Sequence, residues 1–263
     1  MRLSTHDASF VYGETANGPM HGVSLTLLDG AVSYDEIFAY YEPRVGKIPR
    51  LRQKLAFAPF NLAHPRWVDD PSFDLRNHLI GHRLAPNTTL AQAEAKALEL
   101  AQGVLDRNRP LWRTFVLEGV EGRTLIASLT HHAFVDGATA VALSTVLTDP
   151  SPDPEPQEAA PAWSPEPAPS LLDRWIDAGS AFIEQGAENL RRMRQLPAAE
   201  PSRLARVVEA LAQPVMQAPW NRSLVGPKRQ LAYFTVSLED IKRIRSAHGG
   251  TVNDVAVSTV MEG

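Results

Sequence analysis

Cysteine is absent from this chain of 263 residues. Its absence excludes disulfide bonds, thiolate metal sites and a cysteine nucleophile. The chain also has no run of about 18 apolar residues, the length that a membrane-spanning helix needs. Residues 1–7 lack the apolar core of a signal peptide. These absences predict a cytoplasmic protein.

Charge of one sign is not in large excess, because 26 Lys and Arg residues stand against 30 Asp and Glu residues, for a formal net charge of −4. This balance gives no electrostatic basis for binding nucleic acid. Apolar residues make up 44 % of the chain and charged residues 21 %, which is typical of a globular protein with a substantial core.

Signatures of nucleotide-binding loops and zinc proteases are missing as well. Among the scattered histidines, only His78 and His82 are four residues apart. Their segment has the pattern of a strand rather than a helix, so we expect no metal site there.

Residues 1–149 have the alternating and helical patterns of one mixed α/β domain. Strands are expected at 21–28, 112–117 and 124–130, and helices at 34–41, 89–105 and 138–147. Only the sequence EGVEG separates the last two strands, which predicts an antiparallel hairpin.

The composition changes at residue 150. Eight prolines lie between Pro150 and Pro169, mixed with acidic and small residues. We therefore expect residues 150–170 to be a stiff, solvated linker without chemistry of its own. Residues 171–225 follow as a helical connection with two amphipathic segments. Their apolar faces can pack on a neighbouring domain, the preferred interpretation, or lie on a membrane or lipid-droplet surface.

Residues 226–263 begin what we interpret as a second domain. A strand is expected at 229–237, a helix capped by Ser237 follows, and another helix opens at Thr251. One strand and two helices do not bury a core on their own. We therefore expect these residues to pack against a C-terminal half, present as further sequence or as a separate chain.

The sequence HHAFVDG, from His131 to Gly137, carries the strongest chemical signal. It lies where a strand meets a helix, and neighbouring strand residues point to opposite faces, so only one of His131 and His132 can face a substrate. Neutral imidazole can accept the proton of an alcohol near neutral pH. Asp136 can hold the turn or cap the helix, and Gly137 leaves room for close backbone approach. The alternative is a pair of hydrogen-bonded structural histidines.

This segment resembles the HHxxxDG motif of the chloramphenicol acetyltransferase-like acyltransferases, a superfamily that includes peptide-synthetase condensation domains. Three further segments are similar to those of wax ester synthases/diacylglycerol acyltransferases. They are Leu3–Phe10 with Pro19–His21 at the opening, Leu105–Trp112 with its PLW sequence, and Thr251–Val255 with its Asn-Asp pair. The four segments follow the family's order and span nearly the whole chain.

The resemblance implies an α/β fold of the α+β two-layer kind. It implies two chloramphenicol acetyltransferase-like domains, the first whole here and the second only begun, with the active site in a channel between them. The implied activity is acyl-CoA-dependent O-acyl transfer. It would make triacylglycerol from diacylglycerol or wax ester from a long-chain alcohol, with acyl-CoA as co-substrate and with no cofactor or metal.

The resemblance also implies roles for individual residues. His132 would be the general base and would act without a covalent acyl-enzyme. Asp136 would be more structural than catalytic. His131, Asn253 and Asp254 would support the site.

Some of these residues have structural interpretations too. Asp254 fits the acidic position of a capping box opened by Thr251. Pro110, Leu111 and Trp112 are expected to pack in the interior rather than to contact acyl-CoA.

Two rival functions remain open. One is an acyltransferase of the condensation-domain type whose donor sits on a carrier protein, and the opening segment and residues 106–112 argue against it. The other is a catalytically silent lipid-binding protein. The intact set of His132, Asp136 and Gly137 argues against this second rival.

Limited proteolysis should cut the chain between Pro150 and Pro169 before it cuts the flanking units. This segment has few side chains able to bury apolar area, so nothing offsets the entropy of ordering it. Mass spectrometry of the first fragments would locate the cut. Strong hydrogen-exchange protection across the whole segment would contradict the linker interpretation.

Overall fold

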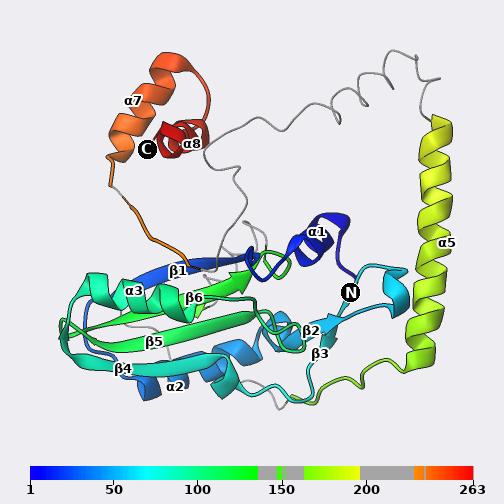
Figure 1. The fold of residues 1–263 in the computed structure, drawn as a ribbon, viewed down its shortest axis with the longest axis horizontal. Coiled ribbons are helices and arrows are strands. Elements are labelled where there is room, and N and C mark those ends of the chain that lie inside the picture. Colours follow the sequence, from blue (N-terminus) through cyan, green and yellow to red (C-terminus); the bar gives the residue numbers. More distant parts are fainter. Residues whose placement is uncertain (136–146, 150, 152–162, 196–227, 234, 263) are drawn as a thin grey trace. The chain divides into compact units, whose positions relative to one another are not determined.

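The computed structural model describes residues 1–135, 147–149, 151, 163–195, 228–233 and 235–262 (Figure 1). The chain divides into two units, Met1–Arg229 and Gln230–Gly263, which are described separately below.

A four-stranded sheet forms the centre of the first unit. Its strands are β1 (His21–Leu28), β4 (Leu79–Thr88), β5 (Trp112–Val120) and β6 (Arg123–His131), in the order β1-β6-β5-β4 (Figure 1). β6 is antiparallel to both of its neighbours, whereas β4 and β5 are parallel. The long runs of buried residues in β5 and β6 show that the middle of the sheet is covered on both faces. The expected strands 21–28, 112–117 and 124–130 and the expected hairpin are confirmed.

Two capped helices belong to this sheet, and both begin where the sequence predicts. α2 (Tyr34–Gly46) opens with a capping box at Ser33, and α3 (Leu90–Leu100) opens with one at Thr89. α3 is shorter than expected and ends at Leu100 rather than near residue 105.

α2 and α3 lie on opposite faces of the sheet, as two adjacent residues of β4 demonstrate. A side chain added at Gly81 would meet the ring of Tyr34 in α2. Burial, and then the nearby ammonium of Lys96 in α3, lower the pKa of the next residue, His82. Because neighbouring strand residues point to opposite faces, the two helices cover different sides (Figure 1).

Smaller elements surround one end of the sheet. They are α1 (Thr5–Gly13), β2 (Gln53–Ala56), β3 (Arg66–Asp69), η1 (Pro49–Arg52), η2 (Pro59–Asn61) and η3 (Leu75–Asn77). β2 and β3 form a separate two-stranded antiparallel sheet. The sequence patterns predicted none of these elements.

The helix α5 (Leu171–Gln195) confirms the first amphipathic segment of the predicted helical connection. Its Asp177 carboxylate forms ion pairs with Arg2 at 2.7 Å and with Arg66 at 2.9 Å. None of the described helices is long and apolar enough to span a bilayer.

The last part of the expected linker contacts residues of the first 75 positions. The ring of Trp163 lies under the guanidinium of Arg52 and meets Phe73 edge-on, with ring centroids 6.3 Å apart. The backbone N–H of Glu166 donates to Asp69 at 3.1 Å. Cleavage in the linker is therefore expected before Trp163 rather than after it. The second amphipathic segment lies outside the described residues. So do the expected helix 138–147, except for Leu147, and residues 150–162, except for Ser151.

The second unit contains α7 (Leu238–His248) and α8 (Val252–Glu262). Ser237 caps α7 as expected, by accepting two backbone N–H groups. The expected strand at 229–237 is wrong, because its described residues form no ladder and no other strand is described in this unit. No described residue of Gln230–Gly263 is buried, which agrees with the expectation that one strand and two helices bury no core.

Gly81→Ala should destabilise the first unit. The added Cβ would lie 2.9 Å from Cγ and Cδ2 of Tyr34, whose hydroxyl is held by the carbonyl of Leu79 at 3.0 Å. Overpacking of this kind costs about 1–3 kcal/mol, and a thermal melt would show it. Gly22→Ala in β1 is the matched control, because nothing lies within 4 Å of its added Cβ. Equal melting temperatures for the two variants would refute the close contact.

Candidate functional site

The last residue of β6, His131, is completely buried, with 0 % of its surface exposed. Its backbone N–H donates to the carbonyl of Leu111 at 3.1 Å, and its own carbonyl accepts the N–H of Phe134 at 2.8 Å. The ring atom Nδ1 accepts the backbone N–H of Ala133 at 2.9 Å. An Nδ1 that accepts a hydrogen bond carries no proton, so the neutral ring has its proton on Nε2.

His132 lies outside the sheet and is exposed. Its backbone N–H donates to the carbonyl of Met20 at 2.9 Å, which ties it to the segment that precedes β1. Its ring packs on Phe10 of α1, with centroids 5.1 Å apart. One histidine of the pair therefore points into the interior and the other out of it, as the strand geometry predicts.

The PLW segment is part of the interior. Pro110 is buried, and Leu111 and Trp112 are 0 % and 5 % exposed. The indole N–H of Trp112 donates to the carbonyl of Leu51 at 2.8 Å, and the indole stacks on the buried ring of His78 at 4.8 Å. This burial supports the expected packing role, and the backbone carbonyl of Leu111 also anchors the motif strand.

A carboxylate, that of Glu14, lies close to His131 and pairs with the guanidinium of Arg107. The sequence analysis predicted neither residue as part of the site. The Glu14 side chain is 1 % exposed and approaches Nε2 of His131 at 3.4 Å. Arg107 forms an ion pair with the same carboxylate at 3.0 Å. Arg107 stands in the segment that carried the family resemblance, but its partner is 93 residues away, so no local pattern could link them.

Burial dominates the titration of His131. Desolvation lowers its pKa to about 4, the Glu14 carboxylate opposes this shift, and Arg107 adds to it. Burial also lowers the pKa of His21, the residue of β1 that pairs with His131 in the sheet. The His131 ring is therefore neutral at physiological pH.

The remaining predicted site residues lie outside the described part of the first unit. Asp136 and Gly137 lie outside the described residues. Asn253 and Asp254 belong to the second unit, where Asp254 accepts the N–H of Thr251 at 2.7 Å and Thr251 Oγ1 accepts the N–H of Asp254 at 3.2 Å. Asp254 thus forms the capping box of α8, which was its structural interpretation.

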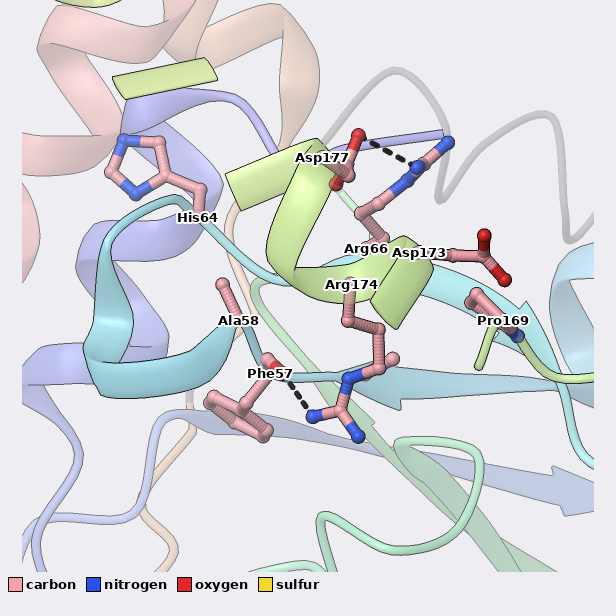
Figure 2. Close-up of a pocket in the computed structure, with 9 residues that line it drawn as sticks. Phe57, Ala58, His64, Arg66, Pro169, Asp173, Arg174 and Asp177 are labelled. Atoms are coloured by element: carbon pink, nitrogen blue, oxygen red, sulfur yellow. Dashed lines mark hydrogen bonds and ion pairs between the residues drawn. The ribbon is translucent and has the colours of Figure 1, made fainter. Parts of the chain in front are cut away.

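Three cavities lie beside α5. The one in Figure 2 has a volume of about 40 Å³ and is lined by Arg174, whose guanidinium donates to the carbonyl of Phe57, and by Asp177. Two larger ones, of about 280 and 420 Å³, adjoin the same helix. Neither His131 nor His132 lines any of the three, so none of these cavities is the candidate site. No metal-binding group of three or more His, Cys, Asp or Glu side chains occurs within the described part of the chain.

The first unit thus carries a strand-end histidine pair, one buried and one exposed, on a mixed sheet with helices on both faces. The chain belongs to the wax ester synthase/diacylglycerol acyltransferase family, whose catalytic-domain model matches residues 3–256. The expected family and fold class are confirmed.

Individual relatives agree with this assignment. The chain is 32 % identical to a putative diacylglycerol O-acyltransferase of Mycobacterium tuberculosis, over 98 % of this chain and 53 % of that protein. It is 28 % identical to the probable diacylglycerol O-acyltransferase tgs3 of the same species, over 94 % of this chain and 96 % of tgs3. The chain thus spans about half the length of the first of these relatives and nearly the whole of tgs3.

A solved structure shares the fold. It is a wax ester synthase/diacylglycerol acyltransferase from Marinobacter aquaeolei VT8, with a TM-score of 0.58 and 21 % identity. The likeness covers 97 % of this chain and 57 % of that one.

Acid should destabilise the protein through His131. The folded state holds this ring neutral down to about pH 4, whereas the unfolded chain protonates it near pH 6.5, so stability falls as the pH drops through that window. Its contribution falls by about 2 kcal/mol between pH 7 and pH 5, and urea unfolding at the two values would measure the loss.

The control is His131→Asn, whose amide oxygen can take the place of Nδ1 without titrating. This variant should lose less stability between the two pH values than the wild type. The loss of stability that remains in this variant includes contributions from His21 and His78, because burial also lowers their pKa values. Identical losses in wild type and variant would contradict the neutral, buried state of His131.

Proposed function

We propose that the protein is an acyl-CoA-dependent O-acyltransferase with His132 as its general base. The acceptor is a hydroxyl lipid, either diacylglycerol, which gives triacylglycerol, or a long-chain alcohol, which gives a wax ester. The proposal rests on the different environments of the two histidines. His131 is buried and already hydrogen-bonded, while His132 is exposed and held by its backbone.

The reaction needs only one proton acceptor. A ring nitrogen of His132 takes the hydroxyl proton while the alcohol oxygen forms a bond to the thioester carbonyl carbon. The tetrahedral intermediate then collapses, its carbon–sulfur bond breaks, and the coenzyme A sulfur leaves with the proton that the imidazolium returns. Acid–base catalysis by one positioned group of this kind contributes about 10²–10⁴-fold.

The family membership supports this assignment over a covalent route. The sequence contains no cysteine and no Gly-x-Ser-x-Gly nucleophile elbow. His131 cannot replace His132, because its Nδ1 is occupied and its Nε2 faces Glu14 in the interior.

The same proposal includes the partners of the first unit. The domain that carries the base consists of residues 1–149. The linker 150–170 and the helical connection 171–225 join it to a second domain, which begins with residues 226–263. In our proposal a C-terminal half packs against them and completes the channel for both substrates. The exposed apolar side chains Tyr233, Val257 and Val260 are consistent with such packing. The whole enzyme would act in the cytoplasm, at the surface of a membrane or lipid droplet where its acceptor collects.

His132→Ala in the full-length protein should lower turnover by at least about 10²-fold, because the base is lost. The assay is transfer of a radiolabelled fatty acyl group from acyl-CoA to diacylglycerol or to hexadecanol. His82→Ala, in β4 of the same sheet, is the matched control and should keep wild-type turnover. Equal activity of wild type and His132→Ala would refute the mechanism.

The same assay separates the rival functions. Transfer from a carrier-protein thioester but not from acyl-CoA would identify the condensation-domain type. Binding of both lipids without transfer would identify a silent lipid-binding protein. Transfer to one acceptor much faster than to the other would fix the acceptor class.

A further inference from the structure

The Glu14 carboxylate is shared by two groups that come from different parts of the chain. Its Oε1 accepts the backbone N–H of Met20 at 2.9 Å. Its Oε2 accepts from Nη2 of Arg107 at 3.0 Å and from Nε at 3.3 Å. The carboxylate is buried, with its side chain 1 % exposed, whereas that of Arg107 is 34 % exposed.

Both ends of this network lead to His132. The carbonyl of Met20 accepts the backbone N–H of His132 at 2.9 Å, so one residue joins the carboxylate to the histidine. Arg107 also donates to the carbonyl of Val11 at 2.6 Å, near the end of α1. The same helix carries Phe10, whose ring packs on the imidazole. The Glu14–Arg107 ion pair is therefore linked to the backbone of His132 through Met20. It is linked to the ring of His132 through α1, which carries Phe10.

Stability alone is a weak reason for such an arrangement. A buried ion pair contributes little, because the cost of desolvating its charges offsets their attraction. A positioned base, by contrast, depends on its surroundings, since a misplacement of about 1 Å can cost about 10²-fold in rate.

We propose that Glu14 and Arg107 are positioning residues for the general base, and that their ion pair fixes the backbone and ring of His132 through Met20 and Phe10. This inference rests on the proposed function. Neither residue touches the substrates; both act on the rate through the placement of His132.

The test uses two disruptive variants and one conservative variant of the full-length protein. Arg107→Met and Glu14→Gln should each lower kcat by about 10- to 100-fold. The KM for acyl-CoA should stay within about twofold, because neither residue contacts substrate. Arg107→Lys keeps a cation beside the carboxylate but loses the forked contact, so it should recover part of the lost kcat.

Arg44→Met is the matched control for instability. It breaks another buried ion pair of the first unit, with Asp149 at 2.6 Å, in which the Arg44 side chain is 5 % exposed. Arg44 lies in α2 and contributes nothing to the Glu14 network. Its variant should melt at a lower temperature and keep the kcat of the folded enzyme.

A spectroscopic measurement makes the test independent of activity. The ¹H–¹³C spectrum of histidine-labelled protein, with the His132 signal assigned from His132→Gln, reports the surroundings of that ring. The signal should shift in Arg107→Met and Glu14→Gln and should stay in place in Arg44→Met.

The outcomes separate the two proposals. If the wild type transfers no acyl group, the proposed function fails and the spectra alone decide the positioning. An unshifted His132 signal in both disruptive variants would overturn the positioning role. A kcat loss no greater than that of Arg44→Met would overturn it too.

Discussion

The hydrogen bond from the backbone of Ala133 to Nδ1 of His131 closes the turn by which the chain leaves the sheet. It spans 2.9 Å inside the protein, where an unpaired N–H would be costly. Because that ring must stay inside to accept the bond, the neighbouring side chain of His132 must point outward. Two chemically identical residues thereby take different roles. One holds the turn, and the other is exposed.

This turn also explains the surroundings of the motif. The carbonyl of Leu111 receives the N–H of His131, so the PLW segment lies at the start of the neighbouring strand. Trp112 then points into the core, where it meets His78 and the carbonyl of Leu51. Core residues of the first unit therefore hold the PLW segment that anchors the motif, and β1 pairs with β6, the strand that carries the motif.

Much of the fold could be predicted from the sequence where the signals are local. Ser33 and Thr89 both open helices with capping boxes, and Ser237 does so with a simpler cap. The hairpin of β5 and β6 follows from two apolar runs and one short turn. The four-residue strands β2 and β3 are too short to show a period. The expected strand at 229–237 has a suitable pattern but no described strand to pair with, and a ladder needs a neighbour.

The candidate site, too, could be predicted from the sequence only in part. The alternation of strand residues predicted that only one histidine of the pair faces outward, and the family resemblance implied that it is His132. The exposure of that residue agrees with both. Glu14 and Arg107 could not be found, because acidic and basic residues are mostly exposed and their burial depends on chain segments far apart in sequence. Asp254 had two interpretations from sequence. Its hydrogen bonds to Thr251 show the capping one, and its supporting role at the site stays a prediction.

The charges beneath the motif also set the state of the buried histidine. A lone Glu14 carboxylate would favour the positively charged, doubly protonated form of His131, and Arg107 opposes this because it lies against the same carboxylate. Burial, the largest cause, lowers the pKa of His131 and keeps the ring neutral. A positive charge on His131 would repel the charge that His132 gains when it takes a proton from an alcohol. In our proposal the ion pair fixes the position of His132, and its Arg107 also offsets part of the effect by which the carboxylate favours a charge on the adjacent ring.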